Sequence, residues 1–187
     1  VWSTNTQVNF CAKAYATVTV EHADAAALTV LGEFLRNGFL HRAIREQGGA
    51  YGSGASQDSS SACFRFFSYR DPRIEETLAD FDRSVSWLLE SEHAPSRLEE
   101  AVLGVVSSID KPGSPSGEAK QAYHSALFGR TPAHRKAFRA RILTVRLADL
   151  QRVAELYLKD QPASVAVITD PNQAETLATG GYQLFKV

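Results

Sequence analysis

The stretch "LHRAIREQGGAYGSGA", residues Leu40–Ala55, combines a basic helix end, a double glycine, a tyrosine and two further glycines. A glycine inside a helix or strand costs about 0.5–1 kcal/mol relative to alanine, so glycines this close together do not serve helix or strand stability. They serve the shape of the backbone or the close approach of another group. Leu40 and Ile44 have helical spacing and a strand pattern follows Tyr51, so the expected order is helix, loop and strand.

This order argues against two familiar kinds of site. Phosphate-binding loops place their glycines between a strand and the positive N-terminus of a helix, whereas these glycines follow a negative helix C-terminus. No Gly-Lys-Ser/Thr sequence follows them either. Ser53 in "YGSGA" looks like the serine of a nucleophile elbow, but that turn runs from strand to helix, and Gly52 is directly adjacent to the serine. We therefore reject both a phosphate site and a serine nucleophile here.

Two interpretations of the glycines remain open on the residues alone. In the first, Gly48 or Gly49 caps the helix in a left-handed conformation, and Arg45 complements the helix dipole. In the second, the glycines let an extended peptide backbone run close to the strand, where Arg45 and Tyr51 donate hydrogen bonds to its carbonyl groups. A phenol aimed at a scissile carbonyl can also stabilise the oxyanion of a tetrahedral intermediate. The residues of this candidate peptide-binding site are Arg45, Gly48, Gly49, Tyr51, Gly52 and Gly54.

The segments before this stretch predict one strand and two helical pieces. Residues Val8–Val20 are rich in β-branched and aromatic residues and partly alternate, which predicts a long strand. A helix follows, with Asp24 available as its cap and Gly38 where it would end. A second helical piece spans Phe39 to Glu46.

The segments after it predict a hairpin and then a series of helices. Strands Tyr51–Ala55 and Ala62–Tyr69 flank the polar turn "SQDSSS". Asp71 as N-cap and Pro72 at the first helical position predict the next helix. Its expected core face is Ile74, Leu78, Phe81, Val85 and Leu88.

The remaining pattern completes an α+β fold. Pro95 and a capping box of Ser96 with Glu99 predict a helix that ends at "DKPGSPSG". Further helices are expected at Glu118–Phe128, Pro132–Leu143 (capped by Thr131) and Leu147–Leu158, and a late strand at Ser164–Thr169. We predict an antiparallel or mixed sheet with helices packed on one face.

Composition points to one ordinary domain. The chain has 187 residues, a net charge of -1 and 44% hydrophobic residues, with no global bias toward nucleic acid or a membrane surface. Residues 1–187 are therefore expected to form a single domain, and a chain that begins at Val1 and has no methionine is expected to be a piece of a larger protein. Cys11 and Cys63 have no C-x-x-C partner and are interpreted as small buried residues, although a disulfide is possible if their strands are adjacent.

At the level of whole segments the sequence resembles a known family. The segments "HADAAALTVLGEFL", "FFSYRDPRIEETL", "SSIDKPGSPSGEA" and "ILTVRLADLQRVAELYL" resemble the C-terminal half of the pitrilysin/insulinase-type zinc metallopeptidases, and "IREQGGAYG" resembles the presequence-protease branch. The resemblance covers about Asn9 to Leu158. It implies a processing-peptidase-like metallohydrolase domain in which Arg45 and Tyr51 reach a peptide bound at the catalytic half.

The resemblance also implies what this chain lacks. The family holds zinc with an inverted H-x-x-E-H helix, and none of His22, His41, His93, His124 and His134 forms such a motif. We therefore expect no metal or cofactor in this chain, zinc in the missing N-terminal half, and no activity from this domain alone. The expected partners are that catalytic half and short unstructured peptides, with no nucleic acid and no membrane.

Three matters stay open at this level. The family also contains zinc-free scaffold or assembly subunits, and an independent ligand-binding module is a weaker third reading. The compartment would be the cytoplasm of a bacterium or the matrix of a eukaryotic organelle. A basic segment from Arg130 to Arg152 is interpreted either as solvated helix surface or as a positive wall facing another domain. Conversely, the acidic segment Asp71–Glu100 of this chain could pair with such a basic patch on a sibling domain.

Overall fold

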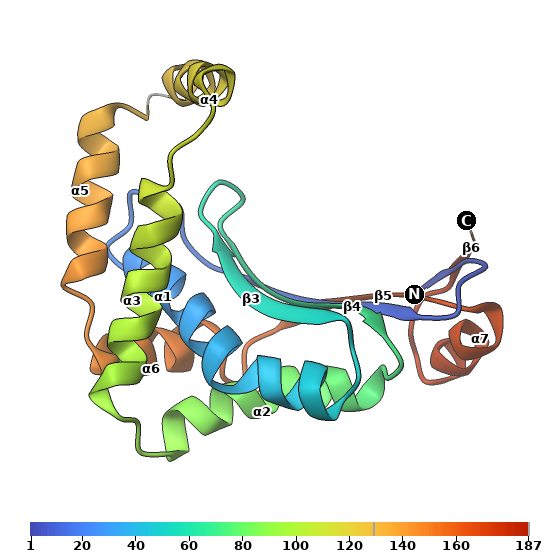
Figure 1. Cartoon of the computed structure of the whole chain (residues 1–187). Helices are drawn as coiled ribbons and strands as arrows, with labels where there is room; N and C mark the ends of the chain where they lie inside the picture. The colour runs from blue at the N-terminus through green and yellow to red at the C-terminus, as the bar shows by residue number, and fades with distance from the viewer. Residues whose placement is uncertain (129, 187) are drawn as a thin grey trace.

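A mixed six-stranded sheet runs through the computed structural model, which describes residues 1–128 and 130–186 (Figure 1). Its strand order is β3-β4-β2-β5-β1-β6, with antiparallel pairing from β3 to β5 and parallel pairing of β1 with β5 and β6. The strands are β1 (Trp2–Ser3), β2 (Asn9–Ala16), β3 (Gly52–Asp58), β4 (Cys63–Asp71), β5 (Ala163–Thr169) and β6 (Phe185–Lys186).

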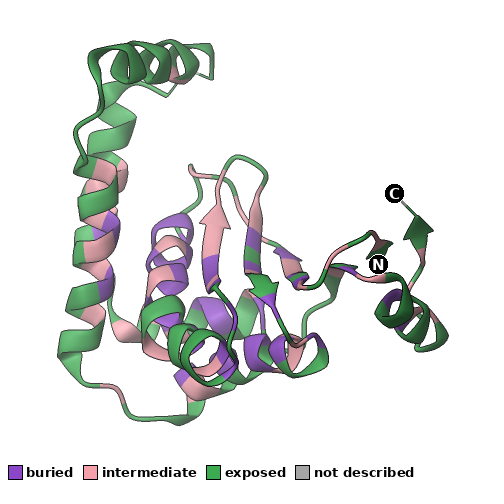
Figure 2. Cartoon of the chain, turned by 45° about the vertical axis from the view of Figure 1, so that its right-hand side comes forward, coloured by how far each residue is buried: buried purple, intermediate pink, exposed green. Residues whose placement is uncertain are grey.

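The helices pack on one face of this sheet and leave the central strands open on the other (Figure 1). They are α1 (Ala25–Leu35), the π-helical segment η1 (Arg36–Gln47), α2 (Glu75–Glu90), α3 (Pro95–Asp110), α4 (Pro115–Leu127), α5 (Pro132–Leu143), α6 (Leu147–Tyr157) and α7 (Pro171–Thr179). Figure 2 shows that buried residues gather where helices meet the strands, whereas α4 is exposed along most of its length. The predicted α+β class with helices on one face is confirmed.

Alternation along the strands decides which side chains enter the core. On β2, Cys11 and Tyr15 are buried toward the helices, while Phe10 lies on the open face. Phe66 of β4 is fully buried, and its ring stacks on Phe81 of α2 at 5.3 Å between centroids. Full burial of one such aromatic side chain contributes about 1.5–3 kcal/mol, so these contacts hold α2 against the sheet.

The first helix does not end at Gly38, where the sequence predicted its end. The chain passes from α1 directly into η1 and stays helical to Gln47. A Cβ atom at Gly38 would lie 2.4 Å from the Trp87 ring of α2. The glycine therefore serves close helix packing instead of a helix end.

Two predicted caps are wrong. Asp71 is the last residue of β4, and its buried carboxylate accepts hydrogen bonds from the Arg73 backbone at 3.0 Å and from the Thr77 hydroxyl at 2.8 Å. Helix α2 consequently begins at Glu75, beyond the predicted start at Pro72. Helix α3 begins at Pro95 after Ala94, so Ser96 is already inside the helix and no capping box forms there.

Other boundaries follow from pairing. The first long strand ends at Ala16, short of the predicted Val20, because Ala16 pairs with Cys63 and β4 begins there. Helix α5 has the predicted bounds, and the Thr131 hydroxyl accepts from the His134 backbone. Sequence reasoning missed α7, although its Asp170–Pro171 start is a recognisable cap signal.

The cysteines cannot form a disulfide. Although β2 and β4 are neighbours, Cys11 lies opposite Ser68 and Cys63 lies opposite Ala16 at the far end of the ladder. Both are free thiols, Cys11 buried and Cys63 half-buried. Burial raises the pKa of the Cys11 thiol to about 12, which keeps it protonated at neutral pH.

Arginines of the basic segment bind other parts of their own domain. Arg139 pairs with Asp110 of α3 at 2.7 Å. Arg141 donates to the carbonyl oxygens of Val20 and His22 at 2.7 and 2.8 Å, and so ties α5 to the loop before α1. These contacts tie α5 to its own domain, while most of the basic side chains stay exposed, and the interpretation as a wall facing another domain stays a prediction.

One buried carboxylate gives the fold a dependence on pH. Asp24 accepts hydrogen bonds from Arg152 at 2.5 Å and from the Tyr157 hydroxyl at 2.9 Å, which join the start of α1 to α6. The hydrogen bond from Arg152 holds the pKa of the Asp24 carboxyl below its usual value. A lowered folded-state pKa stabilises the fold above about pH 4, and this contribution is lost as the pH falls below that.

We therefore expect Asp24→Asn to lower the free energy of unfolding at pH 7 by about 1 kcal/mol, since one buried charge-assisted contact is lost. Below pH 4 the variant and the original protein should converge. Denaturant unfolding at pH 7, 5 and 3 measures this difference, with exposed Glu175→Gln as the control. A constant difference at all three pH values would contradict the assignment.

No helix in the described part of the chain combines the length and the apolar character that crossing a membrane requires.

Candidate functional site

Arg45 and Tyr51 lie on either side of the glycine loop, at one end of the sheet. Arg45 occupies the last turn of η1, and Tyr51 directly precedes β3. The backbone N–H of Tyr51 donates to the carbonyl oxygen of Arg70 at 3.2 Å, which fixes the strand start against β4. The structure thus brings the two predicted residues to one short loop.

The loop closes as a helix cap. Gly48 occupies the C-cap position, and Gly49 has a φ of +81°, in the left-handed region that favours glycine. The N–H of Gly49 donates to the Arg45 carbonyl oxygen and that of Ala50 to the Ile44 carbonyl oxygen, both at 3.1 Å. The capping interpretation of the double glycine is confirmed.

A guanidinium group lies beneath Gly48. A Cβ atom at Gly48 would lie only 1.8 Å from Nη2 of Arg73, so the glycine leaves the space that this side chain fills. From there Arg73 donates to the carbonyl oxygen of Ala43 in η1 and to the buried carboxylate of Asp80 in α2, both at 3.2 Å. Arg73 therefore ties the end of η1 to α2 and packs against the loop at Gly48.

The side chain of Tyr51 is largely open to solvent. It is 62% exposed, and its ring lies 5.7 Å from the ring of Tyr69 and 5.4 Å from the guanidinium carbon of Arg70. Within the described residues its hydroxyl group makes no hydrogen bond. The ring is thus in contact with neighbours on one side, and its hydroxyl group remains able to donate a hydrogen bond.

Arg45 is held by a neighbour on the same helix face. Its Nη1 lies 3.1 Å from Nε2 of His41, and Nδ1 of His41 lies 3.3 Å from the Glu46 carboxylate. All three side chains are exposed. His41 therefore contacts one of the two candidate site residues, and the guanidinium keeps further donors free for a ligand.

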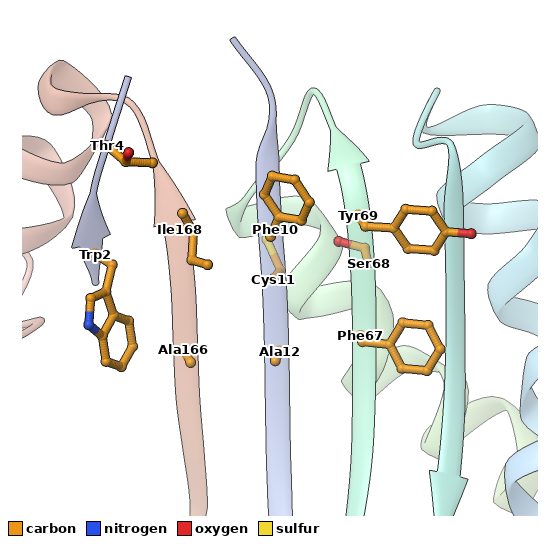
Figure 3. A pocket seen from close by; sticks show the side chains of 10 residues that line it. All are labelled: Trp2, Thr4, Phe10, Cys11, Ala12, Phe67, Ser68, Tyr69, Ala166 and Ile168. Atoms are coloured by element: carbon orange, nitrogen blue, oxygen red, sulfur yellow. The ribbon is translucent and has the colours of Figure 1, made fainter. Parts of the chain in front are cut away.

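The strand glycines have an explanation within the domain. A Cβ atom at Gly52 would lie 2.4 Å from the Tyr69 ring, and one at Gly54 would lie 2.8 Å from the Phe67 ring. Both rings extend from β4 across β3 (Figure 3). The close approach that these glycines permit is therefore that of two aromatic rings, and their direct contact with a peptide stays a prediction.

The described residues contain no group of three or more His, Cys, Asp or Glu side chains placed to hold a metal ion. The described residues therefore do not fit a zinc ion, which the family resemblance assigns to the part of the protein outside this chain. Sequence reasoning missed Arg73 and Tyr69, which support the loop and the tyrosine. Their signal is weak, because an arginine after a proline and a tyrosine on a strand have many uses.

Comparisons with known proteins agree on one kind of domain. The family model described as "PreP C-terminal domain" matches residues 2–178. A relative from Kluyveromyces lactis, "Presequence protease, mitochondrial", is 39% identical over 166 residues, which cover 88% of this chain and 16% of that protein. The chain thus spans about one sixth of the length of this curated relative.

Two solved structures share the fold at low identity. Pitrilysin has a TM-score of 0.64 and 15% identity over 98% of this chain and 21% of its own. A peptidase M16 inactive domain from Pseudomonas fluorescens has a TM-score of 0.67 and 12% identity over 90% of this chain and 42% of its own. These likenesses support the fold, and the sequence relatives support the family.

Proposed function

The chain belongs to the family of presequence-protease C-terminal domains, and from this membership we propose that it is the zinc-free, substrate-holding domain of a peptide-degrading metallopeptidase. The single observation that carries the proposal is that Arg45, in the last turn of η1, and Tyr51, directly before β3, flank one short glycine loop with both side chains exposed. Short, unstructured peptides are the proposed substrates. The proposed partner is the catalytic half of the same protein.

In this proposal Tyr51 acts on the bond that is broken. Its free hydroxyl group donates a hydrogen bond to the scissile carbonyl oxygen, and this bond strengthens as negative charge develops there in the transition state. The contacts of its ring with Tyr69 and Arg70 restrict the directions in which the hydroxyl points. Preorganisation of this kind makes the donor effective without a rearrangement during the reaction.

Arg45 has the role of a clamp. Its guanidinium group binds a backbone carbonyl oxygen next to the scissile bond in the bound peptide, and His41 limits its movement. Zinc, bound by the part of the protein outside this chain, would supply the activated water for hydrolysis. If the source is eukaryotic, the proposed compartment is the mitochondrial matrix, since the relatives are named as mitochondrial.

Replacing Arg45 by Ala in the full-length protein should raise KM about 10-fold and lower kcat much less, because a charged hydrogen bond to the ground state is lost. Steady-state cleavage of a fluorogenic peptide measures both constants. Arg42→Ala, on the same helix and also exposed, is the matched control and should behave like the original protein. Unchanged kinetics for Arg45→Ala would remove the residue from the proposed site.

A further inference from the structure

The open face of the sheet carries a continuous apolar row. Starting from Gly52, each residue of the row lies opposite the next on the neighbouring strand, across all six strands. The five apolar side chains that follow Gly52 in this row are each between 37% and 40% exposed. The apolar row consists of Tyr69, Phe10, Ile168, Trp2 and Phe185.

A hollow lies beside this row because the next row of the face contains two neighbouring alanines. Ala12 pairs with Phe67 on one side and with Ala166 on the other, so the two alanines leave space below the larger side chains. The hollow has a volume of about 660 Å³ and is open to solvent. Figure 3 shows the side chains that line it. Thr4 and Ser68 are the polar residues of an otherwise apolar lining. A hollow of this size falls within the usual range of ligand pockets, about 300–1,000 Å³.

The hollow is continuous with the proposed site. Tyr51 precedes Gly52 in the chain, and its ring contacts Tyr69, the first member of the apolar row. Neighbouring strands lie about 4.8 Å apart, so β5 lies about 14 Å from β3 across the sheet. An extended peptide advances about 3.3 Å per residue and would cover this distance in about four residues.

We propose that the apolar row and its hollow form a subsite that binds an apolar or aromatic side chain of the peptide substrate, about four residues from the scissile bond. This inference rests on the proposed function, since it takes Tyr51 as the position of that bond. Continuity with Tyr51 identifies the occupant as part of the same peptide. The lining includes the ring of Tyr69 and no charged residue, so it favours an apolar side chain of the peptide over a charged one.

The test uses the full-length protein and a series of peptides in which one Phe is moved along a Gly/Ser/Ala background on either side of the cleaved bond. In the original protein kcat/KM should be highest with Phe about four residues away, on the order of tenfold above the peptide with Ser there. Ile168→Thr keeps a β-branched residue and should reduce this preference to about threefold or less. Phe10→Thr provides a second variant, and Leu156→Gln, an exposed leucine on α6, should keep the full preference.

Three outcomes separate the possibilities. Loss of the Phe preference in both row variants, but not in Leu156→Gln, supports the subsite. A preference that is absent from the original protein, or unchanged in both row variants, overturns it. A lower Tm of the full-length protein with Ile168→Thr and an unchanged preference also overturns it, since another part of the protein would then cover this face. The proposed function is tested separately with a short peptide that ends two residues from the cleaved bond and so does not reach the hollow. The kcat of Tyr51→Phe with this peptide is compared with that of the original protein.

Discussion

Replacing Tyr51 by Phe in the full-length protein should lower kcat about 100- to 1000-fold and leave KM within about threefold of its original value. The change removes one oxygen atom and keeps the ring contacts with Tyr69 and Arg70. The hydroxyl makes no hydrogen bond within the described residues, so its removal leaves no partner unsatisfied in the domain. Any loss of rate therefore reports on the substrate in the transition state.

Tyr123→Phe is the matched control for this experiment. Tyr123 is 65% exposed on α4 and lies outside the candidate site, so the variant removes an exposed tyrosine hydroxyl elsewhere on the domain. Its kcat should stay within about threefold of the original value. Steady-state and single-turnover cleavage of one fluorogenic peptide measure both variants. A Tyr51→Phe enzyme with full kcat would favour the alternative that the domain is a non-catalytic scaffold.

The core of the fold could be predicted because local patterns and packing agree there. The sequence pattern agrees with the structure along the alternating strand β2, at the polar turn between β3 and β4, and on the buried face of α2. The errors arise where a contact distant in sequence decides the outcome. Gly38 has the appearance of a helix end, yet the ring of Trp87 makes it a packing position inside a helix.

In the candidate site, too, local features could be predicted from the sequence and contacts between distant residues could not. The cap formed by Gly48 and Gly49 is local, and sequence reasoning included it among the alternatives. The support from Arg73 joins residues far apart in the chain, and no spacing rule reveals it. The placement of Tyr51 beside Tyr69 depends on the register of β3 against β4, which a sequence pattern restricts but does not fix.

Gly48→Ala should destabilise the domain by about 3 kcal/mol and lower kcat/KM at least tenfold. The backbone at Gly48 has a φ of -84°, which any residue adopts, so the effect comes from space alone. The new methyl group would lie 2.5 Å from the Ile44 carbonyl oxygen and would overlap the Arg73 guanidinium. If Arg73 moves away, it loses its contacts with Ala43 and Asp80, and the loop between Arg45 and Tyr51 loses its support.

Gly49→Ala separates this clash from ordinary backbone strain. Its φ of +81° is unfavourable for alanine, but the nearest atom to the new methyl group, Cγ of Pro72, lies at a normal contact distance of 3.5 Å. A cost of about 1 kcal/mol is expected there. Thermal or denaturant unfolding of the full-length variants gives both values.

A double-mutant cycle then tests the cause. Removing the Arg73 side chain opens space for the methyl group, so Gly48→Ala should cost less in an Arg73→Ala background than in the original protein, by about 1 kcal/mol or more. The overlap with the Ile44 carbonyl oxygen remains and leaves part of the cost in place. Strict additivity of the two changes would show that Gly48 and Arg73 act independently. Coupling in both unfolding free energy and kcat/KM would show that one packed contact sets the stability of the loop and the position of its two donors.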